Sequence, residues 1–179
     1  MINKKLEICK RYESTAKAYD KRYIDIQYQK FREILEKVPL SNKWLILDVG
    51  GGTGLLKDFI PSLNRNIFIL DLSFSMLKEA RKKDKESFVI CGDGENLPFR
   101  DKIFDIITCI STLQNMPEPL KSLREQKRVA KKGAKIIVTV LKKSYSKNDL
   151  REIVEKAGLD IIEMFQMKIE DIATIVENK

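Results

Sequence analysis

One segment constrains the fold of this chain more than any other. Residues 45–54 read Leu-Ile-Leu-Asp-Val-Gly-Gly-Gly-Thr-Gly, so an extended apolar run leads directly into a loop with four glycines in five positions. Glycine has no Cβ, so such a loop can turn sharply with positive φ and bring its N–H groups close to a ligand. A loop of this kind between a buried strand and the start of a helix is typical of nucleotide-like cofactor sites.

The rest of the chain alternates between strand and helix patterns. The first 38 residues are helical in pattern, and we expect two segments there. Further helices are expected at 55–60, 73–83, 117–132 and 146–158, and strands at 44–49, 66–71, 87–91, 103–110 and 135–141. The last two extended runs, 160–167 and 171–176, are too close together for a helical crossover and predict an antiparallel hairpin.

This alternation predicts an α/β fold. We expect a doubly wound, seven-stranded mixed sheet with helices on both faces, a C-terminal antiparallel strand hairpin, and a ligand at the carboxyl ends of the first strands. At 179 residues the chain should form a single domain, with residues 1–40 as a helical lid or extension and residues 44–179 as the core. No stretch approaches the ~18 consecutive apolar residues of a membrane span, and the N-terminus lacks a signal-like apolar run. We therefore expect a cytoplasmic protein without membrane insertion.

Composition excludes several kinds of chemistry. The chain has no histidine, and its three cysteines, Cys9, Cys91 and Cys109, form no Cys-x-x-Cys pair. We therefore expect no metal site and no dithiol redox centre. Cys91 and Cys109 lie in strand-like runs, which favours buried thiols. A catalytic base would have to be a carboxylate, a tyrosine or a lysine, and the sequence singles out none.

The net charge is +8, and its distribution is uneven. Residues 41–110, which contain the glycine loop, carry 10 Lys/Arg against 10 Asp/Glu, so the basic excess lies in the two flanks. A basic flank can attract nucleic acid. Lysines interspersed with acids are equally typical of an ordinary solvated surface.

Four observations decide between the cofactors that such a loop could hold. The dinucleotide fingerprint Gly-x-Gly-x-x-Gly fails, because its sixth position counted from Gly50 is Leu55. Asp71 ends the second strand, where a carboxylate can accept both hydroxyls of a ribose; its alternative role is to cap the next helix. Asp93 follows the third strand, where it could bind the amino group of an adenine or simply shape a turn. The terminal strand hairpin is also foreign to ordinary dinucleotide domains.

Together these motifs resemble the class I S-adenosylmethionine-dependent methyltransferases. The resemblance is carried by segments 48–54, 71–76, 92–99 and 104–107, and it is closest to the group that includes the ubiquinone/menaquinone-biosynthesis methyltransferases. The pair Tyr19-Asp20 also resembles a Tyr-Asp pair that precedes the core in that group. The resemblance implies a Rossmann-like core, methyl-transfer activity and S-adenosyl-L-methionine as the cofactor.

The resemblance also implies a set of cofactor-binding residues. Asp71 would bind the ribose, Asp93 the adenine amino group, and Ser111 would face the methionine end. Leu72 and Met76 would flank the adenine, although apolar residues at that spacing usually pack in a core. The full set is Tyr19, Asp48, Gly50, Gly51, Gly52, Gly54, Asp71, Leu72, Met76, Asp93, Gly94, Glu95 and Ser111.

The methyl acceptor is less constrained than the donor. Gln114 and Asn115 follow the fourth strand and could orient a substrate, or they could be ordinary loop residues. This segment lacks the histidine common in relatives and the Asn-Pro-Pro-Tyr tetrad, which disfavours methylation of adenine N6 or glutamine. Because only the N-terminal 40 or so residues are available as a lid, the sequence favours an RNA or protein acceptor, served by an activating partner subunit. The alternatives are a small quinone-type acceptor, a non-catalytic cofactor-binding subunit and a nicotinamide dehydrogenase.

Overall fold

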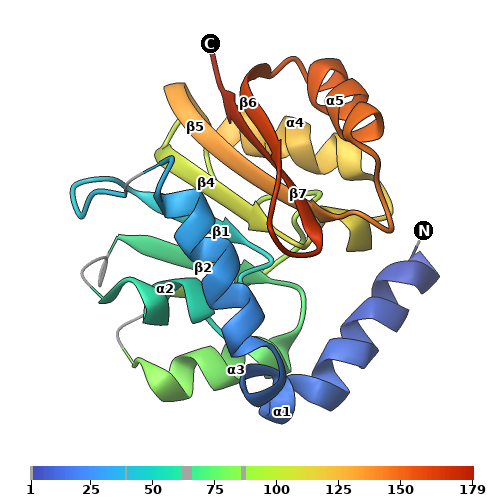
Figure 1. The fold of residues 1–179 in the computed structure, drawn as a ribbon. Coiled ribbons are helices and arrows are strands. Elements are labelled where there is room, and N and C mark those ends of the chain that lie inside the picture. The colour runs from blue at the N-terminus through green and yellow to red at the C-terminus, as the bar shows by residue number, and fades with distance from the viewer. Residues whose placement is uncertain (1, 39, 62–65, 86–87) are drawn as a thin grey trace.

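A computed structural model describes residues 2–38, 40–61, 66–85 and 88–179. Its centre is a seven-stranded sheet in the order β3-β2-β1-β4-β5-β7-β6 (Figure 1). The strands are β1 (Ile46–Val49), β2 (Ile67–Asp71), β3 (Phe88–Cys91), β4 (Phe104–Ile110), β5 (Ala130–Leu141), β6 (Asp160–Gln166) and β7 (Asp171–Glu177). Strands β1 to β5 are parallel, while β7 is antiparallel to both β5 and β6. The predicted mixed sheet with a C-terminal hairpin is thus confirmed.

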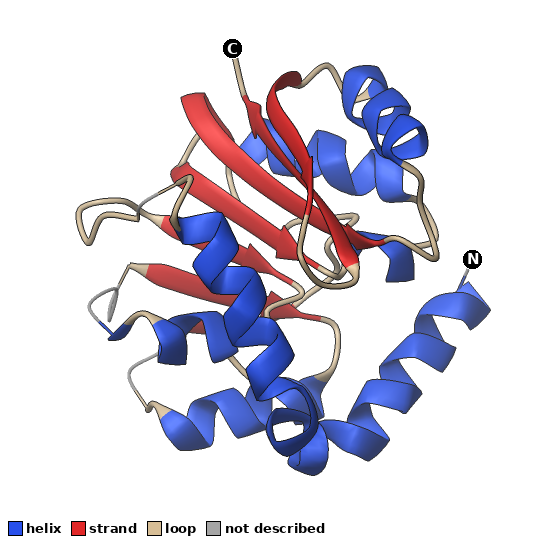
Figure 2. Cartoon of the chain, in the orientation of Figure 1, coloured by secondary structure: helices blue, strands red, loops and turns tan. Residues whose placement is uncertain are grey.

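Helices cover both faces of this sheet (Figure 2). They are α1 (Ile2–Leu35), α2 (Leu55–Phe59), α3 (Phe74–Lys83), α4 (Pro119–Val129) and α5 (Lys147–Lys156), with a 3-10 turn η2 (Leu113–Asn115) after β4. Successive strand residues point to opposite faces, so Ile46 packs in the cluster with α1 and α2 while Leu47 packs in the cluster with α4 and α5. The near-continuous apolar character of the central strands follows from this burial on both sides.

Helix α1 differs from the two separate segments that we expected. Its sequence contains neither proline nor glycine, so the helical hydrogen bonding continues from Ile2 to Leu35. The hydroxyls of Ser14 and Thr15 both donate back to the carbonyl of Arg11, at 2.9 and 3.0 Å. Such back-bonding bends helices, and Figure 1 shows the axis of α1 turning between its N-terminal arm and the part on the sheet.

Two smaller expectations were also wrong. Helix α4 ends at Val129 rather than at Lys132-Gly133, because Ala130 already pairs with Phe104 and begins β5. Cys91 is exposed, since β3 is an edge strand, whereas Cys109 is buried as expected. The expected start of the third strand at Ser87 lies outside the described residues. Within the described part of the chain, no helix has the length and apolar character needed to cross a membrane.

Candidate cofactor-binding site

A large cavity opens at the carboxyl ends of β1, β2, β3 and β4. It contains about 980 Å³ of empty space, part of it open to solvent. The cofactor residues expected from the sequence that line it are Tyr19, Asp48, Gly50, Gly51, Gly52, Asp71, Leu72, Met76, Asp93, Gly94, Glu95 and Ser111. Gly54 is not among the lining residues; it forms the N-cap of α2. The topology therefore gathers residues from four strand ends into one space, as parallel strands do at a change of strand order.

The glycine loop needs its glycines for two separate reasons. Gly50, Gly52 and Gly54 have φ values of 72°, 56° and 77°, a region that residues with a Cβ rarely adopt. The loop is also crowded, because a Cβ on Gly50 would lie 2.2 Å from Cγ2 of Thr112. A Cβ on Gly51 would lie 2.6 Å from Oδ2 of Asp48. The bare backbone thus leaves the cavity floor open to a ligand.

Asp71 holds the loop from the end of β2. Its Oδ2 accepts a hydrogen bond from the N–H of Gly52 at 3.0 Å, and its Oδ1 accepts one from the N–H of Ser73 at 2.8 Å. Ser73, not Asp71, is the N-cap of α3, and its Oγ accepts from the N–H of Met76. Burial raises the pKa of the Asp71 carboxyl, and the backbone N–H groups offset part of that rise.

Asp48 is a buried acid of the cavity wall, with 4% of its surface exposed. Burial raises its pKa to about 7, and the nearby Asp71 adds to the rise. The hydroxyl of Thr108 donates to Asp48 Oδ1 at 2.7 Å and limits the increase. A carboxyl in this state is partly protonated at neutral pH, and a positively charged group in the cavity would favour its ionised form.

The loop after β3 carries Asp93, Gly94 and Glu95. Asp93 Oδ1 accepts from the N–H of Glu95 at 2.9 Å, which is the turn role considered above. Its Oδ2 accepts from Nζ of Lys5 at 2.6 Å. The carboxylate of Glu95 is fully buried, forms an ion pair with Lys5 and accepts from the N–H of Glu118 at 2.6 Å. Lys5 of α1 therefore donates a hydrogen bond to Asp93, the carboxylate expected to bind the adenine amino group.

The apolar residues expected near the adenine differ in their surroundings. Leu72 is 37% exposed at the cavity edge, so it is not a core residue. Met76 is 3% exposed, and its Cε lies 2.9 Å from the position of a Cβ on Gly52. Tyr19 lines the cavity from α1, and burial raises the pKa of its phenol. Met76 thus combines a core position with a place on the cavity wall.

The two residues expected to orient a substrate both lie in the 3-10 turn η2, but their side chains have different partners. Asn115 lines the cavity, whereas Gln114 does not. Asn115 Nδ2 donates to the hydroxyl of Tyr12 at 3.2 Å, and its Oδ1 accepts from Arg11 at 3.2 Å. Gln114 instead donates to the main-chain carbonyl of Ser111 at 2.6 Å. Asn115 therefore connects the cavity wall to α1 through hydrogen bonds, and Gln114 stabilises the backbone of the loop after β4.

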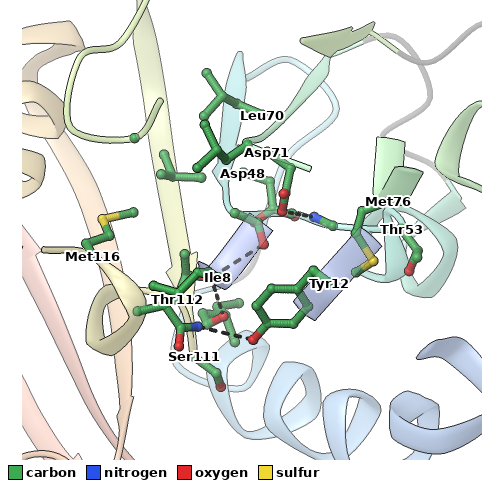
Figure 3. Close-up of a pocket in the computed structure, with 18 of the residues that line it drawn as sticks. Ile8, Tyr12, Asp48, Thr53, Leu70, Asp71, Met76, Ser111, Thr112 and Met116 are labelled. Carbon is green, nitrogen blue, oxygen red and sulfur yellow. Dashed lines mark hydrogen bonds between the residues drawn. The ribbon is translucent and has the colours of Figure 1, made fainter. Parts of the chain in front are cut away.

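Sequence reasoning missed most of the contribution of α1. Five residues of this helix besides Tyr19 line the cavity: Lys5, Ile8, Tyr12, Gln27 and Phe31. Figure 3 shows the ring of Tyr12 between Thr112 and Met76, facing the residues of the strand ends. Asp20 fastens this helix to the glycine loop by accepting a hydrogen bond from the Thr53 hydroxyl. The spacing of Tyr12 and Tyr19, seven residues apart on one helix face, is a signal that could have identified this wall.

This geometry defines a class of site. A glycine cradle, two buried or half-buried carboxylates at neighbouring strand ends and apolar walls suit a ligand with a ribose, an aromatic base and a charged tail. Among the described residues, no group of three or more His, Cys, Asp or Glu could hold a metal ion. The site is therefore that of a nucleoside-type organic cofactor on a doubly wound α/β domain.

Comparison with known proteins identifies the family. Residues 47–138 match the family model described as a methyltransferase domain. The chain belongs to this family, the class I S-adenosylmethionine-dependent methyltransferases, whose cofactor is S-adenosylmethionine.

The relatives extend this result. The demethylmenaquinone methyltransferase of Renibacterium salmoninarum is 38% identical over 93 residues, covering 52% of this chain and 39% of that protein. This chain spans about half or less of the length of the curated relatives that it matches.

The protein solved in complex with the Haloferax volcanii Trm112 methyltransferase activator has a TM-score of 0.84 at 19% identity, covering 93% and 97% of the two chains. Magnesium protoporphyrin IX methyltransferase of Synechocystis, solved with bound S-adenosylmethionine, has a TM-score of 0.80 at 17% identity, covering 98% and 97%. These likenesses in structure show a shared fold.

Proposed function

We propose that this chain transfers the methyl group of S-adenosylmethionine to a small, largely apolar acceptor that binds beneath α1. The observation that carries the proposal is the helix itself, since Ile8, Tyr12, Tyr19 and Phe31 all line the cavity. A helix fastened across the mouth of a site favours an acceptor that fits under it. The aromatic and aliphatic side chains favour one with an apolar or aromatic body.

The residues around the glycine loop fit the methyl donor. Asp71 would bind the ribose hydroxyls, and Asp48 would attract the positive amino group of the methionine part. S-adenosylmethionine, when bound, supplies a methyl group on a positively charged sulfur. The chain would then orient the acceptor in line with that methyl group and keep water out, which accounts for much of the rate in such displacements.

The relatives support a small acceptor. Demethylmenaquinone, named for the Renibacterium relative, is a quinone, and protoporphyrin, named for the Synechocystis structure, is a large planar ring system. The sequence favoured RNA or protein because it offered too little lid. Helix α1 supplies that cover, and this weakens the reason for the larger acceptors.

A second candidate rests on one observation. The protein solved with the Trm112 activator matches this chain over nearly its whole length. This likeness supports an alternative in which an activating subunit binds the chain and the acceptor is RNA or protein. The basic excess of the two flanks is compatible with it.

The test is to follow the label from tritium-labelled S-adenosylmethionine in a cell extract separated into organic-soluble small molecules, RNA and protein. We expect the label in the organic-soluble fraction. Tyr12→Ala should raise the KM for that fraction, because it opens the wall beneath α1, while Lys156→Ala on α5 serves as a distant surface control. Label that appears only in RNA or protein would refute the small acceptor and favour the second candidate. Absence of label in every fraction would refute the activity itself.

A further inference from the structure

A buried ion pair lies behind Ser111, one of the residues that line the cavity. Lys30 of α1 is 1% exposed, and Asp171 at the start of β7 is fully buried. Lys30 Nζ lies 2.9 Å from Asp171 Oδ1. The only other acid that the described residues place near this lysine is Glu170, which is exposed and 3.7 Å away. Burying two charges is costly, so the pair calls for an explanation beyond stability.

Ser111 connects this pair to the cavity. It follows β4, lines the cavity and has a φ of 52°, one of two positive φ values among the described residues other than glycine. Its N–H donates to the carbonyl and to the hydroxyl of Thr139, at 3.1 and 2.9 Å. Gln114 holds its carbonyl from the other side. A residue held so firmly in an unfavourable conformation is a candidate for a functional role.

The hydrogen bonds of the Ser111 hydroxyl leave one position open. Its proton goes to Asp171 Oδ2 at 2.6 Å, and one lone pair accepts from Lys30 Nζ at 2.8 Å. The Thr139 hydroxyl, 3.4 Å away, donates to the same Asp171 oxygen at 2.6 Å and has no second proton to give. A hydroxyl has two lone pairs, so the second lone pair of Ser111 can accept from a ligand in the cavity.

We propose that Ser111 and Asp171 form a proton relay that takes the proton of the methyl acceptor, with Lys30 holding the relay in place. Ser111 is the catalytic residue, because it faces the acceptor; Asp171 and Lys30 act through it and are positioning residues. This inference rests on the proposed function. It also assigns Ser111 to the acceptor rather than to the methionine end of the cofactor.

The step balances with the groups present. The bond from the acceptor atom to carbon forms as the sulfur–methyl bond breaks, and that electron pair returns to sulfur, which becomes neutral. The acceptor proton passes to Ser111 Oγ while the Ser111 proton passes to Asp171 Oδ2. The sulfonium charge and the carboxylate charge disappear together, so no net charge is created in the buried site. Lys30 holds the carboxylate in position through the 2.9 Å ion pair to its other oxygen.

The first test is Ser111→Gly, because glycine accepts the positive φ and leaves the ion pair intact. The rate is measured as transfer of labelled methyl into whichever fraction of the cell extract the wild-type protein labels. We expect kcat to fall by about 100-fold or more, as for the loss of a proton-transfer group. Affinity for S-adenosylhomocysteine, measured by calorimetry, should stay within about threefold, since this side of the cavity faces the acceptor.

The second variant is Asp171→Asn, which keeps the shape but cannot take the proton. We expect the same loss of kcat, and the double variant should be no more than about threefold slower than Ser111→Gly alone, because residues of one relay are not additive. The matched control is Glu170→Gln, an acid beside the same lysine but outside the relay, which should retain the wild-type rate. If Asp171→Asn fails to fold, the rate of Ser111→Gly still tests whether the relay operates.

The outcomes separate the possible explanations. Ser111→Gly with a rate within about threefold of wild type would overturn the relay and leave the ion pair as an anchor for α1. A loss of S-adenosylhomocysteine affinity in proportion to the loss of rate would overturn it in favour of a cofactor contact. If the wild-type protein labels no fraction, the proposed methyl transfer is wrong, and the relay that depends on it is wrong as well.

Discussion

Asp48→Asn tests the electrostatics of the cavity wall most sharply. The carboxyl has a pKa of about 7 in the folded protein against 3.8 as its ordinary value. The difference is roughly three pKa units, and each unit corresponds to about 1.4 kcal/mol, so the ionised carboxylate costs the folded state up to about 4 kcal/mol. Asparagine has the same shape, can still accept from the Thr108 hydroxyl and carries no charge.

The sign follows from proton binding. Between the two pKa values the folded protein binds more protons at Asp48 than the unfolded chain does, so this residue makes stability fall as pH rises from about 4 to about 7. Above about pH 7 the full cost is present. We therefore expect Asp48→Asn to be more stable than wild type at about pH 8, by about 2–4 kcal/mol, and this advantage to shrink to about 1 kcal/mol at about pH 4.5.

Urea unfolding measured across this pH range, with the fluorescence of Trp44 as the probe, gives both free energies of unfolding. Trp44 is the single tryptophan and lies just before β1. Asp25→Asn, an exposed position on α1, controls for the loss of one surface charge. Equal stability of wild type and Asp48→Asn at about pH 8, or a less stable variant there, would show that an ionised Asp48 does not destabilise the folded protein.

Three further predictions concern the same wall. Asp71→Ala should weaken S-adenosylhomocysteine binding in calorimetry by ~1.5–3 kcal/mol, because it removes an acceptor for two ribose hydroxyls; unchanged affinity would exclude this role. Gly50→Ala should lower the free energy of unfolding in urea by more than Gly133→Ala. Both glycines have positive φ, but a Cβ on Gly50 would collide with Thr112, whereas the described residues leave the space at Gly133 open; equal losses would contradict the crowding. S-adenosylhomocysteine should bind up to ~10-fold more tightly at about pH 8 than at about pH 6, because the amino group of the ligand favours ionised Asp48; a flat profile would argue against that contact.

Local patterns were enough to predict the sheet and the loop at its centre. Apolar runs bounded by turn residues mark each strand, and the short gap between the last two runs permits only a hairpin. The glycine loop and Asp71 could be expected to lie together, because the loop follows β1 and Asp71 ends β2, the two parallel strands joined through α2. The ends of the elements were harder to predict. Helix α4 ends before Ala130, because Ala130 pairs with Phe104 of β4, whereas the sequence signal for the end of the helix is Lys132-Gly133.

Features that depend on contacts between distant parts of the chain could not be predicted. Nothing local to Lys5 indicates that it reaches Asp93, and nothing local to Lys30 indicates that it meets Asp171. Both pairs depend on how α1 lies against the completed sheet. Lys30 does lie four residues before the buried Ile34 on the same helix face, so a lysine in an apolar stripe was a usable signal. The case of Gln114 is local: the 3-10 turn directs its side-chain amide to the carbonyl of Ser111, and Gln114 does not line the cavity.

We propose that the glycine loop and the strand-end carboxylates bind a methionine–adenosine cofactor. The most direct measurement is a calorimetric titration of the wild-type chain with S-adenosylhomocysteine and, separately, with NAD. We expect saturable binding of one S-adenosylhomocysteine per chain and no heat from NAD beyond dilution. Binding of NAD without binding of S-adenosylhomocysteine would contradict the claim.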